Sequence, residues 1–111
     1  MSRSRVPTTS EVITAVMGSR EMYEIAALPS GNPGVGRPRE LAAWSVLLLG
    51  VLARHYRSGA RAEAELRSEL LWRHVQAEAA RARSAGLDVP HATRPPTWHA
   101  WRRARDHVWA T

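Results

Sequence analysis

The sequence predicts an all-α protein, a small bundle of four or five helices arranged around one buried helix. The first observation is the stretch 41–53, which is apolar on almost every face apart from Ser45 and Gly50. A helix that is hydrophobic all round is normally buried all round, and crossing a bilayer would require about 20 such residues. The second observation is that the period-two alternation typical of strands is absent along the chain. We therefore expect a central helix over about 38–56.

The N-terminal part predicts an arm followed by helix. Residues 1–7 are basic and lack an apolar period, so we expect a flexible basic arm there. Thr8 and Glu11 have the spacing of a capping box, which starts a helix. The apolar spacing then continues past Gly18, a candidate break, and predicts an inward position for Ile25.

The rest of the chain divides into segments that belong to one helical domain over residues 8–111. Three helices are predicted after the central one, two of them joined closely and the third following a proline-containing loop. Their expected ranges are 60–67, 69–84 and 98–109. The glycine- and proline-rich segment 29–37 cannot hold a helix and predicts a loop before the central helix.

The charge of the chain favours a polyanionic partner. All sixteen basic side chains are arginine, against ten acidic residues, which gives a formal net charge of +6. A net positive domain attracts polyanions, of which nucleic acid is the commonest. A solvated basic surface without any partner is the alternative.

Enzymatic chemistry finds no support in the sequence. There is no cysteine, so disulfides and thiolate metal sites are excluded. His99 and His107 are eight residues apart without an obvious third ligand, and no nucleophile motif or phosphate-binding loop is present. We expect neither catalysis nor a cofactor nor a metal.

The segment Gly36-Arg37-Pro38-Arg39 is the sharpest local signal for DNA binding. Arginines on an extended backbone can enter the narrow minor groove, where the potential is most negative. The segment resembles the core of an AT-hook, although Val35 stands where that motif usually has a basic residue. In this reading Arg37 and Arg39 bind the minor groove. In the alternative, Pro38 only starts the central helix.

The two helices within 60–83 form a candidate helix-turn-helix. The second would lie in the major groove, with Arg73 and Gln76 toward bases or phosphates and Arg61 close by. A purely structural helical hairpin has the same pattern.

The C-terminal segment interleaves aromatic and basic residues. Trp98 and Trp101 stand beside Arg102 and Arg103, an arrangement that allows stacking on bases together with phosphate contacts. Tryptophans at helical spacing are more often part of a core, because each buries a large area.

Several features along the run 36–72 occur together in an order found in a known family. They are Gly36-Arg37-Pro38-Arg39, Trp44 with Leu47-Leu48-Leu49, Ser58-Gly59-Ala60-Arg61, Glu63-Ala64-Glu65-Leu66 and Trp72. This pattern resembles the N-terminal region of a group of actinobacterial DDE-type transposases. The resemblance implies a helical region that serves DNA binding and precedes a catalytic domain. The 111 residues leave no room for a catalytic DDE core, so it implies a detached or truncated module.

The sequence thus predicts a cytoplasmic, non-catalytic DNA-binding module, a remnant or accessory of a mobile element. Double-stranded DNA is the expected partner, with a full-length transposase or a second copy of the chain as further candidates. No membrane partner is expected. The alternative function is a helical protein–protein interaction module that does not bind nucleic acid and uses apolar surface around its tryptophans.

Overall fold

The computed structural model describes residues 7–26, 43–92 and 94–107 and confirms the all-α class. Within these residues there are six helices and no strand. They are α1 (Thr9–Met17), α2 (Arg20–Ala26), α3 (Ala43–Tyr56), α4 (Gly59–Leu66), α5 (Glu69–Ser84) and α6 (Trp98–His107). The predicted loop at 29–37, the arm at 1–6 and the start of the central helix lie outside the described residues.

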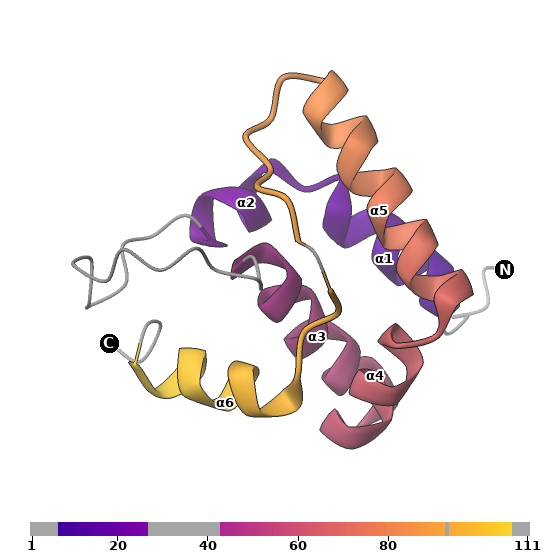
Figure 1. Cartoon of the computed structure of the whole chain (residues 1–111), viewed down its shortest axis with the longest axis vertical. Helices are drawn as coiled ribbons and strands as arrows, with labels where there is room; N and C mark the ends of the chain where they lie inside the picture. Colours follow the sequence, from indigo (N-terminus) through magenta and orange to yellow (C-terminus); the bar gives the residue numbers. More distant parts are fainter. Residues whose placement is uncertain (1–6, 27–42, 93, 108–111) are drawn as a thin grey trace, which may run out of the picture.

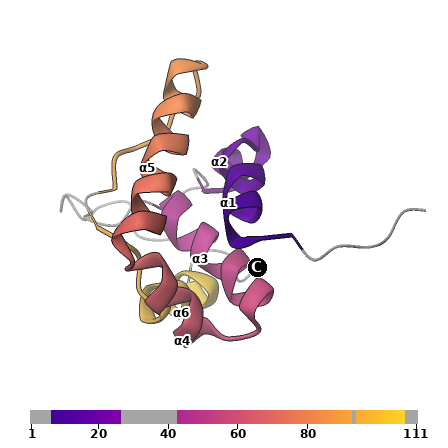
Figure 2. The ribbon, with the colours of Figure 1, turned by 90° about the vertical axis from the view of Figure 1, so that its right-hand side faces the viewer.

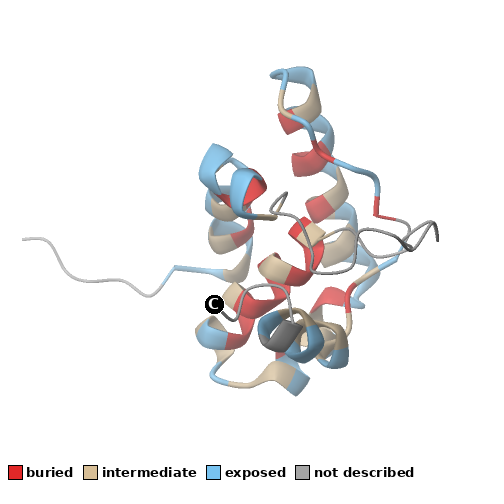
Figure 3. Cartoon of the chain, turned by 90° about the vertical axis from the view of Figure 1, so that its left-hand side faces the viewer, coloured by how far each residue is buried: buried red, intermediate tan, exposed pale blue. Residues whose placement is uncertain are grey.

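Helix α3 lies at the centre of the fold, as the sequence predicts. It contacts α1, α2, α4 and α6 (Figure 1). Leu48, Leu49 and Leu52 are fully buried and Trp44 is nearly so, and most positions from Trp44 to Ala53 are buried (Figure 3). Because neighbours cover several sides of α3, an all-round apolar sequence is what this position requires.

The N-terminal helices confirm the capping box and the break at Gly18. The Thr8 hydroxyl accepts the Glu11 backbone N–H at 3.2 Å, while the Glu11 carboxylate accepts the Thr8 N–H at 2.9 Å. Gly18 caps α1, and α2 begins two residues later. The inward position predicted for Ile25 is wrong: this side chain is 46% exposed, and Tyr23 is buried on α2 instead.

Helices α4 and α5 follow one another closely, as predicted. Ser68 starts α5 by accepting the Leu71 backbone N–H at 3.2 Å. Helix α5 runs beside α1 (Figure 2), buries Val75 and Ala79, and carries His74, whose Nε2 lies 3.2 Å from the Thr14 hydroxyl. The inner face of α5 is therefore committed to the core.

The segment between α5 and α6 is held by side chains that donate to its backbone carbonyls. The Arg83 Nε donates to the Val89 carbonyl at 2.6 Å. The Trp44 indole N–H donates to the Pro90 carbonyl, also at 2.6 Å. These bonds fix a segment that lacks regular structure, and the chain returns along it to place α6 against α3.

No helix in the described ranges has both the length and the apolar composition needed to cross a bilayer.

Candidate nucleic-acid interface

Three arginines gather where α3 ends and α4 begins. Arg54 lies in the last turn of α3, Arg57 in the connection and Arg61 in the first turn of α4, and all three are exposed. We call this set the arginine corner.

Arg57 has a backbone conformation that is unusual for its residue type. Its φ of 58° lies in the left-handed region, which costs roughly 1–2 kcal/mol for a residue with a Cβ. The Ser58 N–H donates to the Ala53 carbonyl at 3.0 Å, the bond that closes a helix around a left-handed residue. Glycine usually occupies this position because it has no Cβ. Arg57 therefore carries an exposed guanidinium at a position whose backbone conformation disfavours any side chain.

Arg61 is positioned by its neighbours. Its guanidinium lies 4.9 Å from the centroid of the Tyr56 ring, within the range of a cation–π contact. The Tyr56 hydroxyl in turn lies 2.5 Å from the Thr9 hydroxyl of α1. Arg61 is exposed and lies against the Tyr56 ring.

Helix α6 docks beside this corner through two tryptophans that pack against glycines. A Cβ on Gly50 would lie 2.8 Å from the Trp101 ring, and a Cβ on Gly59 would overlap the Trp98 ring. The two indole rings stack, with centroids 6.1 Å apart and planes inclined by 27°. Both tryptophans are half-buried against the core, which supports the structural reading of their spacing.

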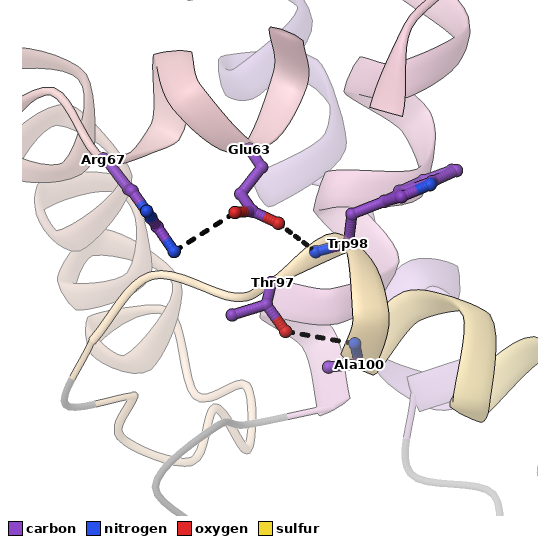
Figure 4. A network of polar contacts seen from close by, with 5 residues as sticks. All are labelled: Glu63, Arg67, Thr97, Trp98 and Ala100. Atoms are coloured by element: carbon purple, nitrogen blue, oxygen red, sulfur yellow. Dashed lines mark hydrogen bonds and ion pairs between the residues drawn. The ribbon is translucent and has the colours of Figure 1, made fainter. Parts of the chain in front are cut away.

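The N-terminus of α6 is capped from within and from another helix (Figure 4). The Thr97 hydroxyl accepts the Ala100 N–H at 3.1 Å. One carboxylate oxygen of Glu63 accepts the Trp98 N–H at 2.5 Å, and the other lies 3.1 Å from Arg67. Glu63 thus joins α4 to α6 and is occupied by two partners.

Helix α6 carries two further exposed arginines. Arg102 and Arg103 follow Trp101 directly, and Trp101 contacts Gly50, one helical turn before Arg54. Within the described part of the chain, five exposed arginines of α3, α4, α6 and the α3–α4 connection form no ion pair with a carboxylate: Arg54, Arg57, Arg61, Arg102 and Arg103.

The arginines of α5 are engaged in contacts within the fold. Arg73 lies 2.6 Å from Glu69, Arg81 lies 3.6 Å from Glu78, and Arg83 donates to the loop backbone. The exposed face of α5 is therefore close to electrical balance.

The sequence-predicted site residues thus fall into separate groups. Arg61 belongs to the arginine corner, Arg102 and Arg103 lie on α6, and Arg73 lies on α5. Gln76 is half-buried, and its amide donates to the Ala92 carbonyl at 2.9 Å, a contact within the fold. Two consecutive helices are present, but nothing in their geometry assigns them to DNA reading. Arg37 and Arg39 lie outside the described residues.

Arg54 and Arg57 were not among the predicted site residues. The available signal was their spacing with Arg61, three and four residues apart across the end of the central helix. The left-handed conformation of Arg57 could not be predicted from the sequence. Glycine is the usual residue in that conformation, and the nearest glycine is Gly59, two positions later.

Metal chemistry has no geometric support in the described residues, where no three histidine, aspartate or glutamate side chains converge. The chain was compared with protein-family models, with curated proteins and with solved structures, and no match was found. The relationship to transposases stays a prediction from the residue pattern.

Proposed function

We propose that this chain is a non-catalytic module that binds double-stranded DNA. In this proposal the arginine corner, together with Arg102 and Arg103, contacts the phosphates. The main observation in support of this proposal is that these guanidinium groups are exposed and lack carboxylate partners in the described part of the chain. Binding phosphate here breaks no internal ion pair, whereas binding through Arg73 requires it to leave Glu69.

The local backbone supports the same surface. The N-terminus of α4 lies between Arg57 and Arg61, and the positive end of its helix dipole favours anions. Phosphate contacts position a protein on the duplex without reading sequence. The proposed surface would therefore contribute to the affinity for DNA and fix the position of the protein on the duplex. Recognition of the base sequence would require other residues.

The resemblance to transposases extends the proposal to a biological role. We propose that the chain serves transposition as a DNA-binding module in the cytoplasm. A full-length transposase or a second copy of the chain is its further partner. Insertion of Arg37 and Arg39 into an A·T-rich minor groove stays a prediction of the sequence.

Fluorescence anisotropy with a labelled mixed-sequence duplex tests the proposal. Affinity should fall steeply between about 50 mM and about 200 mM salt, because each phosphate contact releases counterions. The variant Arg61→Gln/Arg103→Gln should bind roughly tenfold more weakly, equivalent to about 1.4 kcal/mol. The matched variant Arg67→Gln/Arg73→Gln removes the same charge from paired positions and should bind nearly as the parent does.

Two outcomes would contradict the proposal. One is the absence of any duplex binding at about 50 mM salt, where phosphate contacts are strongest. The other is equal weakening in the two double variants, which would indicate net charge alone. Self-association or partner binding that is insensitive to salt would favour the interaction-module alternative, because apolar burial does not depend on counterions.

A further inference from the structure

An open groove of about 520 Å³ lies between α3, the α3–α4 connection and α6. This volume falls within the range of about 300–1,000 Å³ typical of small-molecule sites. Its apolar lining comes from Leu47 and Val51 of α3 and from Trp98 and Trp101 of α6. Leu47, Trp98 and Trp101 pack partly against the core, and all four side chains keep some exposed apolar surface, which the groove presents.

The walls of the groove are preformed. Trp98 and Trp101 rest on the backbone at Gly59 and Gly50, and their rings are stacked on one another. The α6 N-terminus that carries Trp98 is held by Glu63. A ligand that enters the groove would therefore meet rings already fixed in place, which lowers the entropy lost on binding.

The cationic groups of the groove all lie at one end. Arg54 and Arg57 line it beside the α3–α4 connection, both exposed and without a described carboxylate partner. Leu47, toward the other end, is ten residues before Arg57, and helical rise makes this roughly 15 Å. The groove is therefore apolar along its length and positive at one end.

We propose that this groove binds a small amphipathic carboxylate, with its apolar body against the two indoles and its carboxylate on Arg54 and Arg57. One anionic head and one apolar tail match the distribution of charge along the groove. An acidic amphipathic helix from another protein fits less well. Its acidic and apolar side chains alternate over several turns, whereas the cations here lie at a single end.

The proposed ligand would also oppose DNA binding, a consequence that rests on the proposed function. Arg54 and Arg57 belong both to the arginine corner and to the groove. A carboxylate on them reduces the positive charge available to phosphates, and the two ligands weaken one another reciprocally. The module would then release DNA when the carboxylate accumulates.

Isothermal titration calorimetry with decanoate, kept below its micelle concentration, tests the site without DNA. Decanoate should bind with a stoichiometry of one, whereas acetate and decyltrimethylammonium should not, because one lacks the tail and the other has the wrong charge. Val51→Trp should abolish binding by filling the groove, and its matched control Leu70→Trp, at an exposed position on α5, should not. Arg54→Gln should weaken binding roughly tenfold even if Val51→Trp does not fold, since Arg54 is exposed.

Binding of decanoate and decyltrimethylammonium with similar affinity would overturn the proposal, as would unchanged binding by Val51→Trp or Arg54→Gln. An acidic amphipathic peptide that binds where decanoate does not would replace the small molecule by a protein partner. In the DNA arm, decanoate should weaken duplex binding by the parent but not by Val51→Trp. The variant Arg61→Gln/Arg103→Gln distinguishes the groove proposal from the DNA-binding proposal. Neither residue lines the groove, so this variant should bind decanoate as the parent does while it binds DNA more weakly. If no duplex binds at all, the proposed function fails, and the decanoate titration alone decides on the groove.

Discussion

At the scale of single residues, Arg57 has a side chain that its backbone conformation disfavours. Arg57→Gly removes the strain of the left-handed conformation, because glycine has no Cβ, but the glycine loses more chain entropy on folding. The strain is the larger of the two effects, so we expect a net stabilisation of about 0.5–1 kcal/mol. Thermal unfolding followed by circular dichroism measures the change, with Arg54→Gly as the matched control. That substitution lies in the last turn of α3 and should destabilise by up to about 1 kcal/mol. A lower melting temperature for Arg57→Gly would show that its side chain stabilises the fold.

Tyr23 links stability to alkaline pH. Burial raises the pKa of its phenol to about 12, with a lowering effect of Arg83 and a raising effect of Glu78. In the unfolded chain the same phenol loses its proton near pH 10. The contribution of Tyr23 to the free energy of unfolding is therefore fully present below pH 10. It should be lost between about pH 10 and about pH 12, which lowers the free energy of unfolding by roughly 2–3 kcal/mol.

Urea unfolding across this pH range measures the effect of Tyr23. In Tyr23→Phe the loss should be nearly absent, although the variant starts about 1 kcal/mol lower because the hydroxyl no longer donates to the Met17 carbonyl. Tyr56→Phe, which changes the second tyrosine, is the control and should keep the alkaline loss. An identical pH profile for the parent and Tyr23→Phe would assign the alkaline loss to other groups.

At the scale of elements, local patterns predicted most of the helices but not the way in which they meet. The capping box at Thr8, the cap at Ser68 and the apolar stripe of α5 depend on residues close in sequence, and all are present. Ile25 continues the helical period yet is 46% exposed, and no helix among the described residues buries that face of α2. Periodicity reports a face of a helix, and only tertiary packing decides whether that face is buried.

The docking of α6 depends on contacts between residues far apart in the sequence. Gly50 interrupts an apolar run and reads locally as a weak point, yet it is the surface on which Trp101 packs. The same holds for Glu63, which reads as a solvated charge on α4 but caps α6. The roles of such positions can be assigned only when the tertiary structure is known. The same is true of the groove and of the arginine corner.

Gly50→Ala tests this packing. The new Cβ would lie 2.8 Å from the Trp101 ring, so the ring must move, and destabilisation of about 1–3 kcal/mol is expected from overpacking. Trp101→Leu removes the clashing ring atoms and should make the same glycine substitution nearly neutral. The double-mutant cycle, measured by urea unfolding, should therefore give a coupling energy above about 0.5 kcal/mol. Additive effects of the two substitutions would mean that Trp101 does not pack on Gly50.

At the scale of the whole molecule, one helix connects the parts of the fold. Helix α3 contacts α1, α2, α4 and α6, and α5 contacts α1 and α4 in turn. The arginine corner begins in the last turn of α3, and the same helix supplies one wall of the groove from Leu47 to Arg54. Stability and the proposed binding surface therefore depend on the same core, and loss of that core should remove both together.

Leu48→Asp tests whether the molecule unfolds as one unit. Leu48 is fully buried, and an unpaired charge there costs several kcal/mol against a total stability of roughly 5–15 kcal/mol. We expect loss of cooperative unfolding, with circular dichroism and tryptophan fluorescence changing together, because four of the five tryptophans lie in helices of the described structure. Leu70→Asp introduces the same group at a position that is 78% exposed and should change stability by no more than about 0.5 kcal/mol. If Leu48→Asp still melts cooperatively near the parent's temperature, α3 is not the centre of the core. Separate transitions for the two probes would show that the molecule does not unfold as one unit.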